Sequence, residues 1–168
     1  MVFELDCGTR VQIRPIEPGD KEKLVTGLRR LSEESIRKRF LAAKPRFTSA
    51  ELRYLTEVDG FNHIALVAVL ADDPDQLVAV ARCVRLPDRP DTAEMAIVVG
   101  DPWQGQGLGR ALATALADAA LAVGIRRFAA TMLGDNEPAR RLMRTFASRL
   151  QEGHVYGGVR EVLVELAA

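Results

Sequence analysis

Three glycines at alternate positions stand between a strand-like run and a long helical pattern. They are Gly105, Gly107 and Gly109, in the segment Gln104–Arg110. Because glycine has no Cβ, it lets the backbone turn sharply and approach a ligand closely. The first N–H groups of the following helix have no partners within the helix, and with the helix dipole they favour an anion. The segment therefore predicts a phosphate-binding loop, for which a diphosphate is the natural ligand.

Two common nucleotide-binding motifs do not fit this loop. A P-loop ends in Gly-Lys-Ser/Thr, whereas Gly109 is followed by Arg110 and Ala111. A Rossmann motif follows the first strand of its unit, whereas this loop follows the fourth predicted strand and has a different glycine spacing. A tight turn that only connects a strand to a helix is the remaining alternative. The preceding sequence Asp-Pro-Trp-Gln argues against it.

Glu94 is the residue best placed to accept a proton. It lies among apolar residues in the run Thr92–Val99, which predicts a strand, and it precedes Val99 by five positions. Removal of a carboxylate from water raises its pKa, and a raised pKa suits a general base. We therefore expect a desolvated carboxylate at Glu94. The alternative is a glutamate at the strand edge that points into solvent.

The composition argues against several other classes of function. The chain has 23 Lys and Arg against 23 Asp and Glu, so no net charge attracts a polyanion, and nucleic-acid binding is not expected. No apolar run is long enough to span a membrane, and no secretory signal is recognisable. Cys7, Cys83, His63 and His154 have no ligand spacing, so neither a disulfide framework nor a metal site is expected. We expect a soluble, cytoplasmic, metal-free protein with Cys83 buried and both histidines in surface or turn positions.

The hydrophobic pattern predicts the elements that must position these residues. Strands are expected at residues 10–14, 64–70, 77–86, 92–99, 126–133, near 153–156 and at 159–166. Asp20, Ser32, Thr48 and Asn136 are expected to cap helices, and a longer helix begins near Leu108. The strand at 92–99, this helix and the strand at 126–133 form a parallel crossover unit. We therefore expect a single α/β (α+β) domain over residues 1–168, with a mixed, mostly antiparallel sheet of six to seven strands and helices on both faces.

The stretch from Ala93 to Arg110 resembles the GNAT superfamily of acetyl-CoA-dependent N-acyltransferases. That family carries Gln/Arg-x-x-Gly-x-Gly/Ala between its fourth strand and third helix, where this chain has Gln104-Gly105-Gln106-Gly107-Leu108-Gly109. The order of elements is similar over residues 10–166. Shorter segments look like the branch that contains bacterial protein-lysine acetyltransferases: Arg14-Pro15-Ile16, Leu31-Ser32-Glu33-Glu34-Ser35 and Arg39-Phe40.

This resemblance implies that acetyl-CoA is a co-substrate and that an amine is the acceptor. By the resemblance, the N–H groups of residues 105–110 hold the pyrophosphate of CoA. The backbone of residues 97–99 pairs with the pantetheine arm and polarises the thioester carbonyl. Asn136 matches an asparagine that contacts this arm, although a plain helix N-cap is the alternative. The implied cofactor residues are Ile97, Val98, Val99, Gln104, Gly105, Gln106, Gly107, Leu108, Gly109, Arg110 and Asn136.

The resemblance also assigns the general base to Glu94 and leaves the general acid open. Many members carry a tyrosine seven residues after the asparagine, and Met143 occupies that position here. Tyr156 is a weak substitute, since a packing role suits it better, and water or a backbone amide could serve instead. The basic cluster Arg37–Arg39, with Lys44 and Arg46, is interpreted as a solvated helix face, or else as a contact for the 3′-phosphate of CoA or an acidic acceptor.

The favoured function is therefore an N-acetyltransferase that acts on a primary amine of a small molecule or a protein lysine. An acyl-CoA-binding module without catalysis is the alternative. The missing acid at Met143 favours this alternative slightly, and Glu94 argues against it. A homodimer is compatible with the sequence. Neither the acceptor nor the acyl-chain preference can be read from it.

Overall fold

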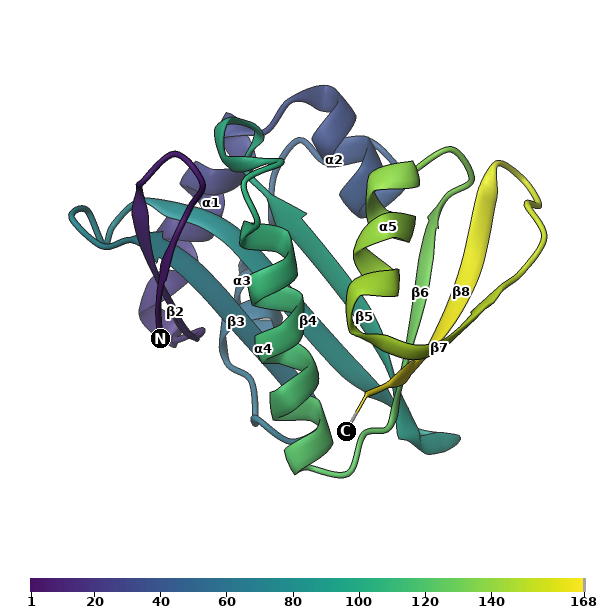
Figure 1. Cartoon of the computed structure of the whole chain (residues 1–168). Helices are drawn as coiled ribbons and strands as arrows, with labels where there is room; N and C mark the ends of the chain where they lie inside the picture. The colour runs from purple at the N-terminus through teal and green to yellow at the C-terminus, as the bar shows by residue number, and fades with distance from the viewer. Residues whose placement is uncertain (168) are drawn as a thin grey trace.

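One mixed sheet forms the centre of the protein (Figure 1). The computed structural model describes residues 1–167, and within them eight strands pair in the order β1-β2-β3-β4-β5-β6-β8-β7. All neighbouring strands are antiparallel except β5 and β6, which are parallel, as the predicted crossover requires. The strands are β1 (Val2–Glu4), β2 (Arg10–Pro15), β3 (His63–Leu70), β4 (Leu77–Leu86), β5 (Arg89–Val99), β6 (Arg127–Leu133), β7 (Ala147–Glu152) and β8 (Val159–Leu166).

Two edge strands differ from the prediction of six to seven strands. The apolar pattern did not predict β1, which has three residues and is too short to show a period of two. The strand expected near residues 153–156 is instead β7, at Ala147–Glu152, and only an isolated bridge joins Tyr156 to Val159. Because β7 lies at the sheet edge and has exposed polar residues, its hydrophobic alternation is weak.

Helices cover both faces of the sheet, as expected. In Figure 1, α4 and α5 lie in front of the sheet and α1 and α3 lie behind it. The helices are α1 (Lys21–Arg30), α2 (Glu33–Phe40), α3 (Ser49–Thr56), α4 (Leu108–Ala122) and α5 (Glu137–Phe146), with short 3-10 turns η1 (Pro18–Asp20) and η2 (Asp101–Trp103). Within residues 1–167, no helix is long and apolar enough to cross a bilayer.

The sequence pattern explains the two cores that hold these layers together. Leu108, Leu112 and Leu116 recur at helical spacing, and all three are fully buried where α4 faces the sheet. Burial of such a side chain contributes about 1.5–3 kcal/mol. The continuously apolar β3 has buried residues along almost its whole length, because α4 covers one face and the α1–α3 layer covers the other.

Three of the four predicted helix caps are confirmed. The side chains of Ser32, Thr48 and Asn136 each accept a hydrogen bond from the backbone N–H three residues later. The prediction for Asp20 is wrong, because its carboxylate makes no cap bond to α1. Asp20 is 2% exposed and pairs with the Arg14 guanidinium at 2.7 Å, since a buried carboxylate needs a charged partner.

His63 is another correction, because the structure buries it at the start of β3. Its Nε2 lies 3.0 Å from Nη1 of Arg82. Burial and the Arg82 charge lower the pKa of His63 to about 4, so the neutral ring accepts a hydrogen bond from the guanidinium. Cys83 is buried as predicted, and burial raises the pKa of its thiol to about 12.

Candidate functional site

An opening in the sheet separates β5 from β6. The two strands pair only where Thr92–Glu94 meets Arg127–Ala129, although β5 continues to Val99 beside β4. The N–H of Gly100 donates to the carbonyl of Val78 in β4 at 2.8 Å. Because N–H directions alternate along a strand, the N–H groups of Ile97 and Val99 point away from β4 and into the opening. An extended ligand could pair with this edge as an added strand does.

The glycine-rich loop begins beside this opening and leads into α4. Gly105 has φ 71° and Gly107 has φ 82°, a left-handed conformation that glycine adopts without strain. No side chain caps α4, and its first intrahelical bond runs from Ala111 N–H to the Gly107 carbonyl at 3.1 Å. The loop therefore presents backbone rather than side chains at the helix N-terminus.

The free N–H groups of this helix start fit a diphosphate. Those of Leu108, Gly109 and Arg110 have no hydrogen-bond partner within residues 1–167. Such groups at a helix N-terminus, together with the helix dipole, favour phosphate. Phosphate binding at this loop stays a prediction, with three free N–H groups as its structural support.

A groove of about 380 Å³ connects the loop with the opening between β5 and β6. It brings together all of the predicted cofactor residues except two. The Leu108 side chain is fully buried in the core and offers only its backbone, and the Gln106 amide folds back onto the Pro102 carbonyl at 2.9 Å. The groove residues that the sequence predicted are Ile97, Val98, Val99, Gln104, Gly105, Gly107, Gly109, Arg110 and Asn136.

Gln104 connects this loop to two other elements. Its side-chain Nε2 donates to the carbonyl of Val99 at 3.0 Å and to Oγ of Ser35 at 3.1 Å. The first bond fixes the loop to the end of β5, and the second fixes it to the start of α2. Gln104 therefore holds the groove's shape through its side chain and leaves the loop backbone free.

Asp101 was not predicted to matter, yet it joins the start of α2 to the same loop. Its Oδ1 accepts from Oγ of Ser32 at 2.7 Å and Oγ of Ser35 at 2.8 Å, and its Oδ2 accepts from the Ser32 N–H at 3.0 Å. Partial desolvation raises the pKa of Asp101, but these hydrogen bonds outweigh it and lower the pKa. The serines and the aspartate lie far apart in sequence, so no local pattern indicated these contacts. The predicted helix cap at Ser32 was the one local sign that this segment matters.

Glu94 is solvent-exposed, so the desolvation expected for it is wrong. Its neighbours Ala93 and Met95 are buried on the opposite face of β5, because strand side chains alternate. Glu94 lines a second cavity of about 480 Å³, whose lining includes Thr131 and Glu161. Its carboxylate makes no hydrogen bond or ion pair within residues 1–167, which leaves it free to accept a proton.

The basic cluster on α2 divides between solvent and the groove. Arg37 and Arg46 are exposed, whereas Lys38 and Arg39 line the groove. Burial lowers the pKa of Arg39, and the nearby Glu94 carboxylate partly offsets that effect. The interpretation as a purely solvated helix face is therefore wrong for Lys38 and Arg39.

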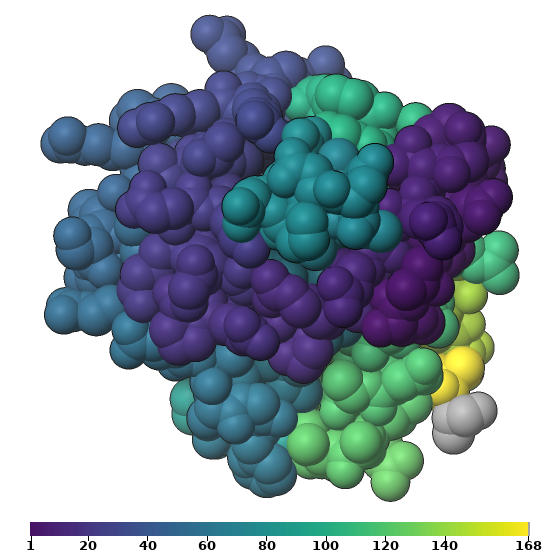
Figure 2. All heavy atoms as spheres, turned by 90° about the vertical axis from the view of Figure 1, so that its left-hand side faces the viewer, coloured from purple at the N-terminus to yellow at the C-terminus, as the bar shows by residue number. Residues whose placement is uncertain are grey.

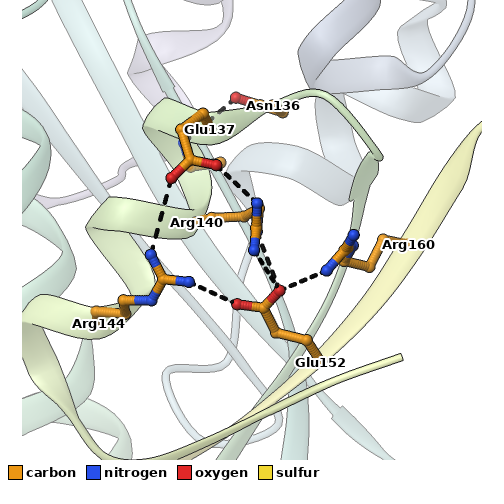
Figure 3. Close-up of polar contacts among 7 residues, drawn as sticks. Asn136, Glu137, Arg140, Arg144, Glu152 and Arg160 are labelled. Atoms are coloured by element: carbon orange, nitrogen blue, oxygen red, sulfur yellow. Dashed lines mark hydrogen bonds and ion pairs between the residues drawn. The ribbon is translucent and has the colours of Figure 1, made fainter. Parts of the chain in front are cut away.

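A network of ion pairs holds the start of α5 beside the groove (Figure 3). The Glu152 carboxylate contacts the guanidinium groups of Arg140 at 2.8 Å, Arg144 at 2.9 Å and also Arg160. Arg140 also pairs with Glu137 in the first turn of α5 at 2.7 Å. The network fixes the helix whose N-cap, Asn136, lines the groove. Asn136 therefore caps α5 and lines the groove at the same time.

The two candidates for a general acid have different surroundings. Met143 is 3% exposed and packs in the core, so this position offers neither a hydroxyl nor access to the groove. Tyr156 is 89% exposed in the connection between β7 and β8, so the expected packing role is wrong. Among residues 1–167, no three His, Cys, Asp or Glu side chains gather in the manner of metal ligands.

Comparisons with known proteins bear on the family and the fold of this chain. The family model "Acetyltransferase (GNAT) family" matches residues 31–147. The chain is 38% identical over 141 residues to Acetyltransferase Pat of Mycolicibacterium smegmatis, which covers 83% of this chain and 41% of that protein. It is 30% identical over 150 residues to Acetyltransferase PA5475 of Pseudomonas aeruginosa, covering 89% of this chain and 78% of that protein. The chain therefore spans less than half the length of the first of these relatives.

Solved structures show the same arrangement. The GNAT domain of S. lividans PAT has a TM-score of 0.88 at 28% identity and covers 99% of this chain and 96% of that one. A cAMP-binding acyltransferase from Mycobacterium smegmatis has a TM-score of 0.67 at 30% identity, covering all of this chain but 47% of its own. Spermidine N-acetyltransferase from Vibrio cholerae, in complex with CoA and spermine, shares the fold at a TM-score of 0.69 and 16% identity, covering 93% of this chain and 95% of that one.

Proposed function

Because the chain belongs to the GNAT family of acetyltransferases, we propose that it transfers an acetyl group from acetyl-CoA to a primary amine of a small molecule or a protein lysine. The observation that carries this proposal is the groove between the free N–H groups at the start of α4 and the unpaired edge of β5. These are the two features that a diphosphate and an extended amide-bearing arm need. Acetyl-CoA, when bound, supplies an activated thioester.

The backbone would hold the co-substrate at both ends of the groove. The N–H groups of Leu108, Gly109 and Arg110 face the pyrophosphate, and hydrogen bonds to a charged group contribute about 1.5–3 kcal/mol each. The N–H groups of Ile97 and Val99 face the pantetheine arm and the thioester carbonyl. A donor fixed in this position stabilises negative charge that develops on the carbonyl oxygen. Arg39 adds positive charge beside the groove, whereas the ammonium of Lys38 pairs with Glu34.

Glu94 would accept the proton that the acceptor must lose. A lysine-type ammonium has a pKa of about 10.4, so the amine must be deprotonated before it attacks. Glu94 precedes Ile97 by three residues, about 10 Å along an extended strand, so the acceptor amine or a water molecule would bridge that distance. Glu152, Glu161 and Arg89 line the same cavity. Its three carboxylates outnumber this one arginine, which favours a cationic acceptor.

The proton balance requires a carrier between the amine and the leaving thiolate. The amine loses one proton to Glu94 and a second when the amide bond forms, and this second proton ends on the CoA thiolate as the carbon–sulfur bond breaks. Because Met143 has no hydroxyl and is buried, water is the proposed carrier of this proton.

The test is a Glu94→Gln variant, with Glu22→Gln as the control on the exposed surface of α1. We expect turnover to fall by about 10²–10⁴, the usual contribution of a general base. Affinity for acetyl-CoA should change by less than about twofold, because Glu94 does not line the cofactor groove. Turnover is followed by release of CoA thiol with a panel of amines and proteins, and affinity by calorimetry. Unchanged turnover would exclude Glu94 as the base, and absence of acetyl-CoA binding would exclude the function.

A second candidate function is an acyl-CoA-binding module without catalysis. Met143 is buried and provides no general acid, and Glu94 is exposed and is not a desolvated base. Both observations favour this alternative. Acetyl-CoA binding without thiol release across the whole acceptor panel would support it.

A further inference from the structure

An apolar cavity of about 390 Å³ lies between α1 and the sheet. Figure 2 shows the side of the molecule where α1, the teal β3–β4 turn and the green segment after β5 approach one another. Of the described residues that line the cavity, Arg30 and Gln76 carry charged or amide side chains. Its apolar walls include Leu24, Leu28, Leu31, Phe40, Phe47 and Leu77.

This apolar cavity adjoins the cofactor groove. Val98 and Trp103 line both of them. The N–H groups of Ile97 and Val99 mark where the thioester carbonyl would lie, and Val98 lies between them. The first carbons of an acyl group would therefore reach Val98, and a longer chain could continue past it into the apolar cavity. Glu94 lines a different cavity four residues earlier on β5, so the acceptor amine would approach from the other end.

Gly27 enlarges the apolar cavity without an evident structural need for glycine. It lies inside α1 and lines the cavity wall. Its φ is not left-handed, and a Cβ at this position would meet only Leu77 Cδ2, at an ordinary contact distance of 3.5 Å. Glycine inside a helix is less favourable than alanine. Neither the backbone nor the packing requires it, and what its missing side chain provides is space.

We propose that this apolar cavity receives the acyl chain of acyl-CoA substrates longer than acetyl, with about six to eight carbons. This inference rests on the proposed function. A volume of about 390 Å³ equals about thirteen times the roughly 30 Å³ that one water molecule occupies in the liquid, which is enough for a chain of that length. Each buried methylene contributes about 0.8 kcal/mol, so it strengthens binding about fourfold.

Calorimetry tests the proposal. It measures the affinity of the full chain for acetyl-CoA, hexanoyl-CoA and octanoyl-CoA. We expect hexanoyl-CoA to bind at least tenfold more tightly than acetyl-CoA. Gly27→Leu should remove this advantage and change the acetyl-CoA affinity by less than about twofold, because the new side chain fills only the apolar cavity. Gly27→Ala is the matched control and should reduce the advantage only partly. If Gly27→Leu does not fold, Leu31→Trp narrows the same cavity from the C-terminal end of α1.

The outcomes separate this inference from the function on which it rests. Equal affinity for all three acyl-CoAs, or a hexanoyl-CoA advantage that survives Gly27→Leu, would overturn the acyl-chain pocket and leave acetyl transfer intact. A pocket that instead receives an apolar side chain of the acceptor would show flat acyl-CoA affinities, with acceptor KM values that change in Gly27→Leu. If no acyl-CoA binds at all, both proposals fail.

Discussion

Replacement of Asp101 with alanine should release α2 from the loop that precedes α4. The carboxylate accepts three hydrogen bonds, from the N–H and hydroxyl of Ser32 and the hydroxyl of Ser35. One further side-chain bond joins these serines to the loop, from Nε2 of Gln104, directly after η2, to Oγ of Ser35 at 3.1 Å. Alanine removes both carboxylate oxygens and with them all three hydrogen bonds, while the Gln104 bond to Ser35 remains, so the variant tests how much of the attachment of α2 comes from Asp101.

The magnitude follows from the number and exposure of these bonds. A hydrogen bond within a protein contributes about 0.5–1.5 kcal/mol net, and the lower half of that range applies because Asp101 is exposed. Three bonds then give a loss of about 2 kcal/mol in the free energy of unfolding. Asp101→Asn should lose about 1 kcal/mol, because its amide oxygen can still accept from both hydroxyls but its NH₂ group cannot accept from the Ser32 N–H.

Urea unfolding of the full chain measures these losses, with Asp72→Ala as the control. Asp72 is exposed and makes no hydrogen bond or ion pair within residues 1–167, so its replacement should change the free energy of unfolding by less than about 0.5 kcal/mol. Affinity for acetyl-CoA should also fall several-fold in Asp101→Ala, because α2 carries Lys38 and Arg39 to the groove. Asp101→Ala with the stability of the Asp72 control would refute the reasoning.

Two further predictions concern titratable groups. Because the pKa of His63 is about 4 in the folded chain and about 6.5 when unfolded, the unfolded state binds more protons below pH 6.5. The free energy of unfolding should therefore fall by about 2 kcal/mol between pH 7 and pH 5. His63→Gln should flatten this dependence in urea titrations and His154→Gln should not, and equal wild-type stability at both pH values would contradict the explanation. A thiol reagent should label Cys7 alone in the native protein, because burial raises the pKa of Cys83 to about 12, whereas rapid labelling of two thiols before denaturation would contradict that burial.

Local patterns predicted the elements that local forces form. The continuous apolar run of β3 indicated a strand covered on both faces, and the caps at Ser32, Thr48 and Asn136 were found where a side chain precedes its N–H partner by three residues. The glycine-rich loop could also be recognised, because the left-handed conformations at Gly105 and Gly107 are a local property of glycine.

Features that depend on distant partners were not predictable in the same way. The apolar neighbours of Glu94 suggested burial, but which face of β5 is covered depends on helices far away in sequence. The same limit applies to His63, because its burial comes from the packing of α3 and β4 around the start of β3. Glu94 and His63 both lie in strands. The alternation of side chains along a strand shows which residues share a face, but it does not show what covers that face.

The amino-acid sequence by itself determined the order of the elements, the position of the glycine-rich loop and the family to which the chain belongs. Only the tertiary structure decided that β5 stops pairing with β6 after Glu94, that Asp101 binds serines more than sixty residues earlier in the chain, and that Gly27 opens onto the cavity beside Val98. The reason is physical: a helix cap or a turn is satisfied within a few residues. An unpaired strand edge or a cavity exists only once segments distant in sequence have packed together.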